Sequence, residues 1–437
     1  MHVTPPRNEL RRVLGPWDAI ALVVGIIIGS GIFATPPLVA RHLGATGPIL
    51  GVWILGGVLA LAGALCYAEL ASRFPRTGGA YVFLREAYGP FPAFCFGWSA
   101  LLVTYPASVA AVSVVFTAYL ARLIPLPDPA RPVVAAGLCL AVAALNIAGV
   151  RLGAAAMRLL TGIKVLALAA VTVAALLAGD TAGGFTPVWN GGAGIGLAAA
   201  ALSLSAVIWT YEGWADGPTL AGEMRDHRRD MVRALVGGTI LVTGIYLVLN
   251  VAYLRVLGVD GVAASDSVAV DLAAAVFGPR GTGFVTALVL VSTLGAMNGM
   301  VVSASRVVFA MSRDGLFFRA AGEVWPRTGS PGTALVAVGV VSAVYAAVGS
   351  FESIVRYFVF TAGIWYLGNV ASLFLHRRRG GPPAPFPVPG FPLTPLLFGG
   401  VTLALLLQLV RSDPRSCFTG LAILALALPV YRIRFRK

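Results

Sequence analysis

Long apolar runs constrain this chain more than any other feature of its sequence. A helix needs roughly 20 apolar residues to cross the hydrocarbon core of a membrane. Runs of about this length lie near 17–40, 46–70, 91–121, 132–150, 157–178, 193–219, 232–256, 282–305, 332–349, 353–376, 391–410 and 416–431. They contain Gly and Pro and lack the polar–apolar alternation of membrane barrel strands. The runs predict an all-α membrane protein with twelve transmembrane helices.

The composition excludes a soluble domain of this size. Hydrophobic residues make up 58% of the 437 residues and charged residues only 11%, and a soluble fold cannot bury so much apolar surface. The first run is too long for the apolar region of a signal peptide, so we expect it to be a retained span. The longest polar stretches, which include 71–90 and 257–281, are expected to be loops.

The net charge of +14 is best explained by membrane topology. With the N-terminus inside, most of the 32 lysines and arginines fall in cytoplasmic segments, which is the positive-inside pattern of a multi-pass protein of the cell membrane. The cations are scattered over several loops, so we expect no nucleic-acid partner. We expect a cytoplasmic N-terminal segment (1–16), ten helices (17–376), a cytoplasmic Pro/Gly-rich loop (377–390), two last helices (391–431) and a cytoplasmic tail (432–437).

Cysteine and histidine give no sign of a metal site. The four cysteines are dispersed, without the paired spacing of a disulfide or zinc framework: Cys66, Cys95, Cys139 and Cys417. The four histidines show no ligand spacing either, and no phosphate-binding G-x-x-x-x-G-K-[ST] motif is present. No cluster of His, Asp and Ser near the end of a span points to a membrane enzyme. We expect no cofactor, no metal and no enzymatic activity.

Two apolar runs contain residues that interrupt a helix. The first has "GSG" (29–31) inside "VGIIIGSGIF", and the sixth, "VIWTYEGWADGPT" (207–219), carries Glu212 next to Gly213. Each begins a set of five runs (17–178 and 193–376), and interruptions at matching positions are typical of transporters with inverted repeats.

A helix break in a membrane has a specific chemical use. Unwound backbone groups are costly against lipid and are tolerated in a protein-lined cavity. Half-helix N-termini suit a carboxylate, and free carbonyls suit an ammonium group. The two breaks therefore predict a site for a zwitterion. For the first break alone, close helix packing across small residues explains "GSG" equally well.

Two charged residues stand inside apolar runs. The chain has 30 arginines but only two lysines, Lys437 at the last position and Lys164 in the fifth run. A lysine can act as a compact point charge or lose its proton, as arginine cannot; alternatively, Lys164 extends toward the membrane edge near Arg158. Glu212 is the carboxylate predicted to lie well inside a span, where ionisable groups are functional candidates. It could bind an amine, pair with another polar group or form a gate.

Six motifs in order resemble one family. They are "VGIIIGSGIFATP", "YAELASRFPRTGGAYVFLREAYGP", "NIAGVRLGAAAMRLLTGIK", "TYEGW", "LVSTLGAMNG" and "SRVVFAMSRDGLFF". This set is similar to the amino acid–polyamine–organocation superfamily, in its bacterial branch of L-type amino acid transporters. The resemblance implies a LeuT-type fold, with a 5+5 inverted repeat and discontinuous helices one and six.

The resemblance also implies roles at the two breaks. The amides of Ser30 and Gly31, with the Ser30 hydroxyl, would hold the substrate carboxylate. The carbonyls of Ile27, Trp209 and Glu212 would receive its ammonium group, and the Trp209 ring would stack over the substrate. Two glycines of the breaks, Gly29 and Gly213, are also predicted to bind the substrate.

Further residues are assigned by the same resemblance. Lys164 would stand where sodium-coupled relatives hold a sodium ion and would bridge span one to span eight, near Ser292 and Thr293. A fixed cation there would make transport sodium-independent, and a proton is a candidate co-substrate. Tyr105 and Trp365 are candidate pocket walls, although a single aromatic residue in a span more often packs or contacts lipid.

The resulting hypothesis is a secondary active transporter that moves amino acids, chiefly neutral L-amino acids, by alternating access as a monomer or weak oligomer in the lipid bilayer. One alternative is an exchanger of cationic amino acids or amines with Glu212 as counter-charge. A passive channel is the alternative from another class, although a repeated filter motif is missing.

Overall fold

The computed structural model describes residues 10, 12, 14–178, 184–189, 196–348, 351–380 and 383–435. Most of the expected N-terminal cytoplasmic segment, the expected start of the second repeat at 193, and Lys437 lie outside these residues. The described part of the chain is built from helices. Its β-structure is one isolated bridge between Leu14 and Met224.

The helices of the first half run from the N-terminal side to residue 177. In chain order they are α1 (Pro16–Ile27), α2 (Gly31–Leu43), α3 (Thr46–Arg73), α4 (Ala80–Tyr88), α5 (Pro90–Ser99), the π-helix η1 (Ala100–Thr104), α6 (Tyr105–Leu120), α7 (Ala130–Ile147) and α8 (Val150–Leu177).

The second half has a similar succession of long and short helices. They are α9 (Leu197–Thr210), the 3₁₀ helix η2 (Trp214–Glu223), α10 (His227–Ala264), α11 (Val268–Phe277), α12 (Pro279–Arg313), the 3₁₀ helix η3 (Arg319–Gly322), α13 (Gly332–Val348), α14 (Phe351–Arg378), α15 (Leu393–Ser412), α16 (Pro414–Ala425) and α17 (Ala427–Arg434).

The prediction of a helical multi-pass membrane protein is confirmed. Among the described residues, ten helical stretches are long and apolar enough to cross a membrane. The other two predicted spans are also helical: α13 is a shorter apolar helix, and the run at 193–219 is divided into α9 and η2.

Some expectations about helix bounds were wrong. α8 begins at Val150 rather than near 157, and α4 and α11 lie inside stretches expected to be loops. Both are short, with 9 and 10 residues. A search for apolar runs long enough to cross a membrane therefore does not detect them.

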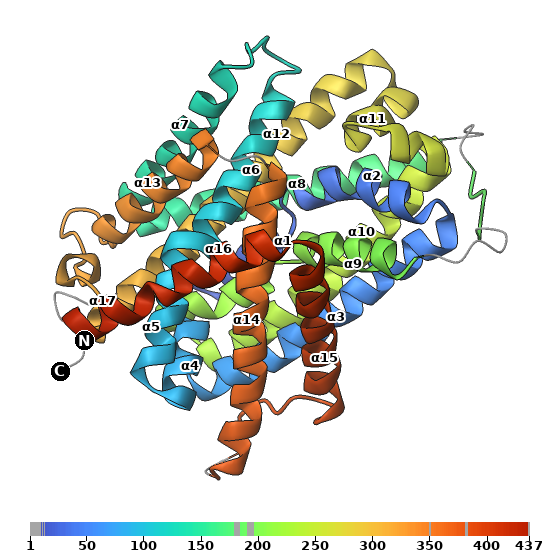
Figure 1. Ribbon diagram of the computed structural model, residues 1–437. Coiled ribbons are helices and arrows are strands. Elements are labelled where there is room, and N and C mark those ends of the chain that lie inside the picture. Colours follow the sequence, from blue (N-terminus) through green and yellow to red (C-terminus); the bar gives the residue numbers. More distant parts are fainter. Residues whose placement is uncertain are drawn as a thin grey trace.

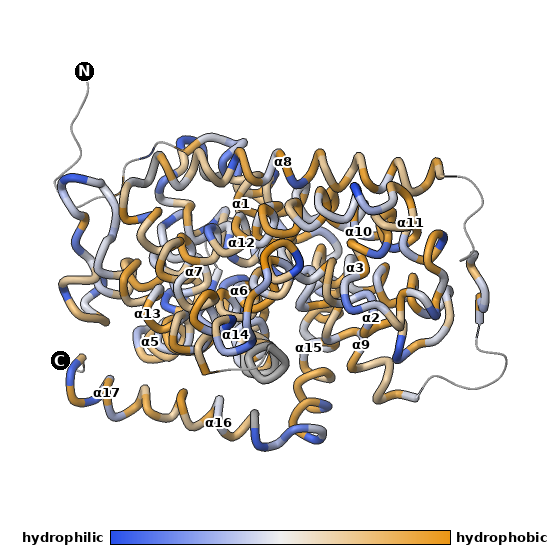
Figure 2. Tube along the Cα trace, turned by 90° about the horizontal axis from the view of Figure 1, so that it is seen from above, coloured by the Kyte–Doolittle hydropathy of each residue, from blue (hydrophilic) through white to orange (hydrophobic). Residues whose placement is uncertain are grey.

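The helices are arranged around α1, which packs against α8, α10 and α12. Seen from above, α8 lies along one long edge of the molecule and the α16–α17 pair along the opposite edge (Figure 2). The outer face of α8 is apolar, and Leu166 and Leu177 there are 73% and 79% exposed. α14 and α15 stand side by side (Figure 1) and pack against each other. The interrupted first helix therefore lies inside the bundle, away from the apolar outer faces.

Candidate functional site

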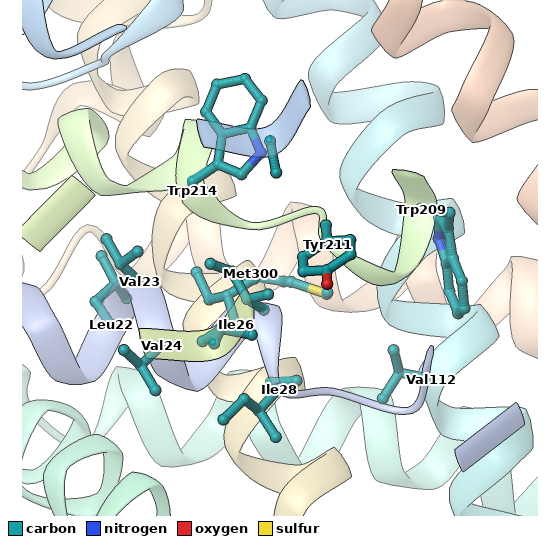
Figure 3. Close-up of a cluster of buried hydrophobic side chains, with 14 of the residues drawn as sticks. Leu22, Val23, Val24, Ile26, Ile28, Val112, Trp209, Tyr211, Trp214 and Met300 are labelled. Atoms are coloured by element: carbon teal, nitrogen blue, oxygen red, sulfur yellow. The ribbon is translucent and has the colours of Figure 1, made fainter. Parts of the chain in front are cut away.

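The first helix is interrupted between Ile27 and Gly31. α1 ends at Ile27 and α2 begins at Gly31, and Ile28 lies where the chain leaves the helix (Figure 3). At Gly29 an added Cβ would lie 3.2 Å from the Cβ of Ala296 in α12, so a small residue is needed there. Ser30 is buried, and its Oγ has no hydrogen-bond partner among the described residues.

The second interruption follows α9. Tyr211, Glu212 and Gly213 form a turn after Thr210, and the chain continues as the tighter helix η2 (Figure 3). Gly213 has φ +128, in a region that favours glycine. The interruptions predicted in the first and sixth runs are both present.

The two breaks touch each other. A Cβ added to Gly31 would lie 2.8 Å from the Cα of Thr210, and one added to Gly213 would lie 2.8 Å from the amide nitrogen of Ile27. Glycine is therefore required on both sides of this contact, because any larger residue would push the breaks apart.

The Ile27 carbonyl, which was expected to receive the ammonium group, accepts two hydrogen bonds from within the chain. Tyr246 of α10 donates its hydroxyl to this oxygen at 2.6 Å, and the amide of Gly29 donates to it at 2.8 Å. A carbonyl oxygen has two lone pairs, so both are already used and this atom is not a free acceptor for an ammonium group.

A small cavity of about 270 Å³ lies between the breaks. Its lining consists of Ile26, Ile27, Gly29, Ser30, Gly31, Ser108, Val112, Trp209, Thr210, Glu212 and Met300. The first amides of α2 have no carbonyl one turn earlier to bind, and a helix N-terminus carries partial positive charge. The cavity is therefore lined by the start of α2, which suits an anion, and by Glu212 of the second break.

Lys164 of α8 lies inside the bundle rather than at a membrane edge. Its side chain is fully buried, and Nζ donates to the carbonyl oxygens of Gly25 at 2.5 Å and Ile28 at 2.7 Å. A third donation, at 3.3 Å, reaches the carbonyl oxygen of Ser292 in α12. Three acceptors match the three N–H groups of an ammonium, so the amine joins the end of α1 to α12.

The two residues expected near this amine make different hydrogen bonds. The Ser292 hydroxyl donates to the carbonyl of Ile28 at 3.0 Å, so it shares an acceptor with Lys164. The Thr293 hydroxyl instead donates to Val289, one turn earlier in its own helix, at 2.8 Å. Among the described residues, Thr293 makes no hydrogen bond to the amine, because on a helix the next residue points about 100° away.

Trp209 and Glu212 lie at the second break. Trp209 is buried in the last turn of α9 and lines the small cavity (Figure 3). Its carbonyl accepts the amide of Glu212 at 3.1 Å. Glu212 also lines two larger cavities, each of about 610 Å³; one is mainly apolar and lies between α3, α9, α14 and α15.

The other larger cavity contains both aromatic residues predicted as pocket walls. Tyr105 and Trp365 line it together with Asp216, and the Tyr105 hydroxyl donates to Asp216 Oδ1 at 2.6 Å. The indole nitrogen of Trp365 donates to Ser99 Oγ at 2.7 Å. Both residues thus line a cavity and make a hydrogen bond within the bundle.

Sequence reasoning missed three polar groups around the site. Asp216 was part of the interrupting motif but received no role, and Tyr246 carried no signal in an apolar run. The third is a buried ion pair: Arg306 of α12 donates to Glu223 through Nε at 2.8 Å and Nη2 at 3.1 Å. Neither partner of that pair lies well inside a predicted run, so nothing in the sequence linked them.

The fold and the site define a class. Apolar helices surround two touching helix breaks and the cavity between them, so the protein is a multi-pass membrane protein with a cavity where two of its helices are interrupted. A family model described as amino acid permease matches residues 14–424, and the chain belongs to this family.

Curated relatives cover nearly the whole chain. It is 32% identical to the b(0,+)-type amino acid transporter 1 of Homo sapiens over 419 residues, which is 94% of this chain and 85% of that protein. It is 31% identical to the serine/threonine exchanger SteT of Bacillus subtilis (strain 168), over 97% of each. The human Asc-type amino acid transporter 1 is 30% identical over 97% of this chain and 82% of its own length. These relatives are transporters, and this chain is an amino acid transporter of the same family.

Proposed function

We propose that this protein is a sodium-independent exchanger of L-amino acids, neutral ones included, that works by alternating access. The observation that carries the proposal is the small cavity between the two breaks, whose lining includes the start of α2 and Glu212. The serine/threonine exchanger supports exchange, because it is similar to this chain over 97% of both lengths.

The proposed substrate pose follows from the chemistry of the breaks. The carboxylate binds the amides of Ser30 and Gly31 and the Ser30 hydroxyl, which has no other partner among the described residues. The ammonium group lies toward the carbonyls of Trp209 and Glu212 and the Glu212 side chain. Trp209 covers the substrate. Ile27 lines the cavity, and its carbonyl oxygen does not bind the ammonium group.

Sodium independence is proposed from Lys164. Its amine supplies a positive charge to the end of α1 from within the chain. A metal ion at that point would have to displace a buried ammonium that already makes three hydrogen bonds.

The proposed topology has twelve spans with both termini in the cytoplasm. Residues 17–376 form two inverted five-helix repeats of the LeuT type, 377–390 a cytoplasmic loop, and 391–431 the last two spans, flanked by the segments 1–16 and 432–437. Spans one and six move against spans three, four, eight and nine. The equivalent places of the two breaks in the chain support this arrangement.

Exchange in liposomes tests the proposal. Purified protein is reconstituted with an unlabelled neutral amino acid inside, and uptake of the labelled amino acid is followed without sodium. We expect saturable uptake that requires internal substrate and is abolished by Ser30→Trp, which fills the cavity. Flux that does not saturate and needs no internal substrate would indicate a channel and contradict the proposal.

A further inference from the structure

The mainly apolar cavity of about 610 Å³ beside the second break has no part in the proposed function. Helix α15 supplies one of its walls, through Phe398, Thr402, Leu405 and Leu406. These positions follow the i, i+4, i+7, i+8 spacing of a single helix face. α15 stands beside α14 (Figure 1) and packs against α14 and α3, so one face of this helix closes the cavity.

α15 touches the bundle closely at both ends of this face. A Cβ added to Gly63 of α3 would lie 3.0 Å from Phe398 Cε2, and one added to Gly363 of α14 would lie 2.8 Å from Leu406 Cδ2. Thr402 stands one turn from each contact and lines the cavity. Glycine already allows the closest approach at both contacts, so a shift of α15 toward the bundle cannot close the space between them.

The walls of this cavity suit an apolar ligand. The Tyr211 hydroxyl donates to the Trp53 carbonyl at 3.2 Å, and the Thr402 hydroxyl donates to the Phe398 carbonyl within its own helix at 2.7 Å. The lining from α3 and α14 is mostly small or apolar: Gly56, Leu59, Ala60, Phe358, Val359, Ala362, Gly363 and Tyr366. Apolar cavities exclude water and take up apolar molecules, and an empty space loses dispersion contacts.

The helices around the cavity also present apolar faces to their surroundings. Leu403 and Leu407 of α15 are exposed, as are Leu202 of α9 and Ile54 of α3. In a membrane-spanning bundle, such faces contact the hydrocarbon of the bilayer. Lipid tails are as apolar as leucine, so an acyl chain can fill the space as well as a side chain would. The bilayer is thus the nearest source of a suitable ligand.

The apolar cavity lies directly behind a wall of the substrate cavity. Trp209 and Glu212 belong to the linings of both. Trp214, the first residue of η2, lines the apolar cavity and is 2% exposed. Its ring stacks on Tyr366 at 5.5 Å and meets Phe398 edge-on at 5.7 Å, measured between ring centroids. A ligand in the apolar cavity would therefore contact the second break from the side away from the substrate.

We infer that an acyl chain of a bilayer lipid occupies the apolar cavity, between the inner face of α15 and the second break. The inference goes beyond the proposed function, because it concerns a resident lipid and not a transported solute. The site recognises hydrocarbon, so it requires no particular headgroup.

Fluorescence quenching by brominated lipid tests the inference. Bromine on an acyl chain quenches a tryptophan only at short range. The full-length protein and Trp214→Phe are reconstituted in phosphatidylcholine vesicles with either dioleoyl or dibrominated chains, and the difference between the two proteins gives the signal of Trp214. We expect this signal to fall about twofold or more in the brominated vesicles, because the apolar cavity admits the chain.

Two variants fill the cavity from opposite walls. Thr402→Phe adds a ring from α15 and loses only a hydrogen bond within that helix. Ala60→Leu adds bulk from α3 at a residue that is 5% exposed and lines the cavity. Either variant should restore the Trp214 signal in brominated vesicles, and each decides the question if the other does not reconstitute. Ala404→Phe, at an exposed position of α15 outside the lining, is the control and should be quenched like the parent.

Two outcomes would overturn the inference. The first is an equal Trp214 signal in both kinds of vesicle. The second is quenching as strong in the cavity-filling variants as in the parent, since bromine would then reach Trp214 from outside α15. Leucine exchange by the parent in dioleoyl vesicles is measured alongside: its absence would contradict the proposed function, whereas neither quenching result bears on that function.

Discussion

The two helix breaks touch, yet they are built in opposite ways. The first spans only Ile28 to Ser30 and is fixed by a buried cation, Lys164, that bonds the end of α1 to α12. The second continues into a ten-residue 3₁₀ helix and carries two carboxylates, Glu212 and Asp216. The difference teaches that a helix break inside this bundle can be held either by a side chain from a neighbouring helix or by a change of helix type within the chain itself.

The largest expected effect tests the cation at the first break. Lys164→Met keeps the length of the side chain but removes the amine, and leaves buried carbonyls of Gly25 and Ser292 without this donor. An unsatisfied buried group costs about 1–3 kcal/mol, so we expect exchange of every amino acid to fall about 100-fold. Liposome uptake measures this loss.

The matched control for that change is Arg411→Met, at an exposed arginine of α15, which should exchange normally. If Lys164→Met exchanged within threefold of the parent, the cation would not support the first break, and the contrast between the breaks would be lost.

An intermediate effect is expected where the breaks meet. Gly31→Ala places a methyl group 2.8 Å from Thr210, and such overpacking costs about 1–3 kcal/mol. We expect kcat/KM to fall about tenfold for every amino acid that is exchanged. In Gly137→Ala, the new methyl group on α7 has no neighbour within 4 Å, and transport should be unchanged. Equal activity of the two variants would show that the breaks need not touch.

The smallest expected effect tests the Ser30 hydroxyl at the first break. Ser30→Ala removes one hydrogen bond to the substrate carboxylate, which is worth about 0.5–1.5 kcal/mol. KM should therefore rise about 3–10-fold, and the factor should be the same for leucine and for lysine. The melting temperature should not fall, because this hydroxyl has no partner among the described residues. Ser342→Ala in α13, whose hydroxyl bonds within its own helix, should leave KM unchanged. A rise in KM for lysine alone would contradict the assignment of the carboxylate to the first break.

Local chemistry made the breaks predictable. Gly29, Gly31 and Gly213 weaken a helix wherever they stand, and polar residues in an apolar run are visible without a structure. The same holds for Lys164, whose rarity in an arginine-rich chain singled it out.

Partners across the bundle were not predictable in this way. Tyr246 and Ile27 are separated by 219 positions, and Tyr105 and Asp216 by 111. Which hydroxyl reaches which acceptor depends on how the helices pack, and no local pattern reports it. The donation from Tyr246 to the Ile27 carbonyl was not predicted for this reason.

The amine of Lys164 has one further consequence. An amine attached to the polypeptide cannot dissociate into the surrounding medium, unlike an ion drawn from it. The hydrogen-bond donor at the first break is therefore present from the time the chain folds, whatever the salt concentration. Dilution of the external salt cannot empty this position.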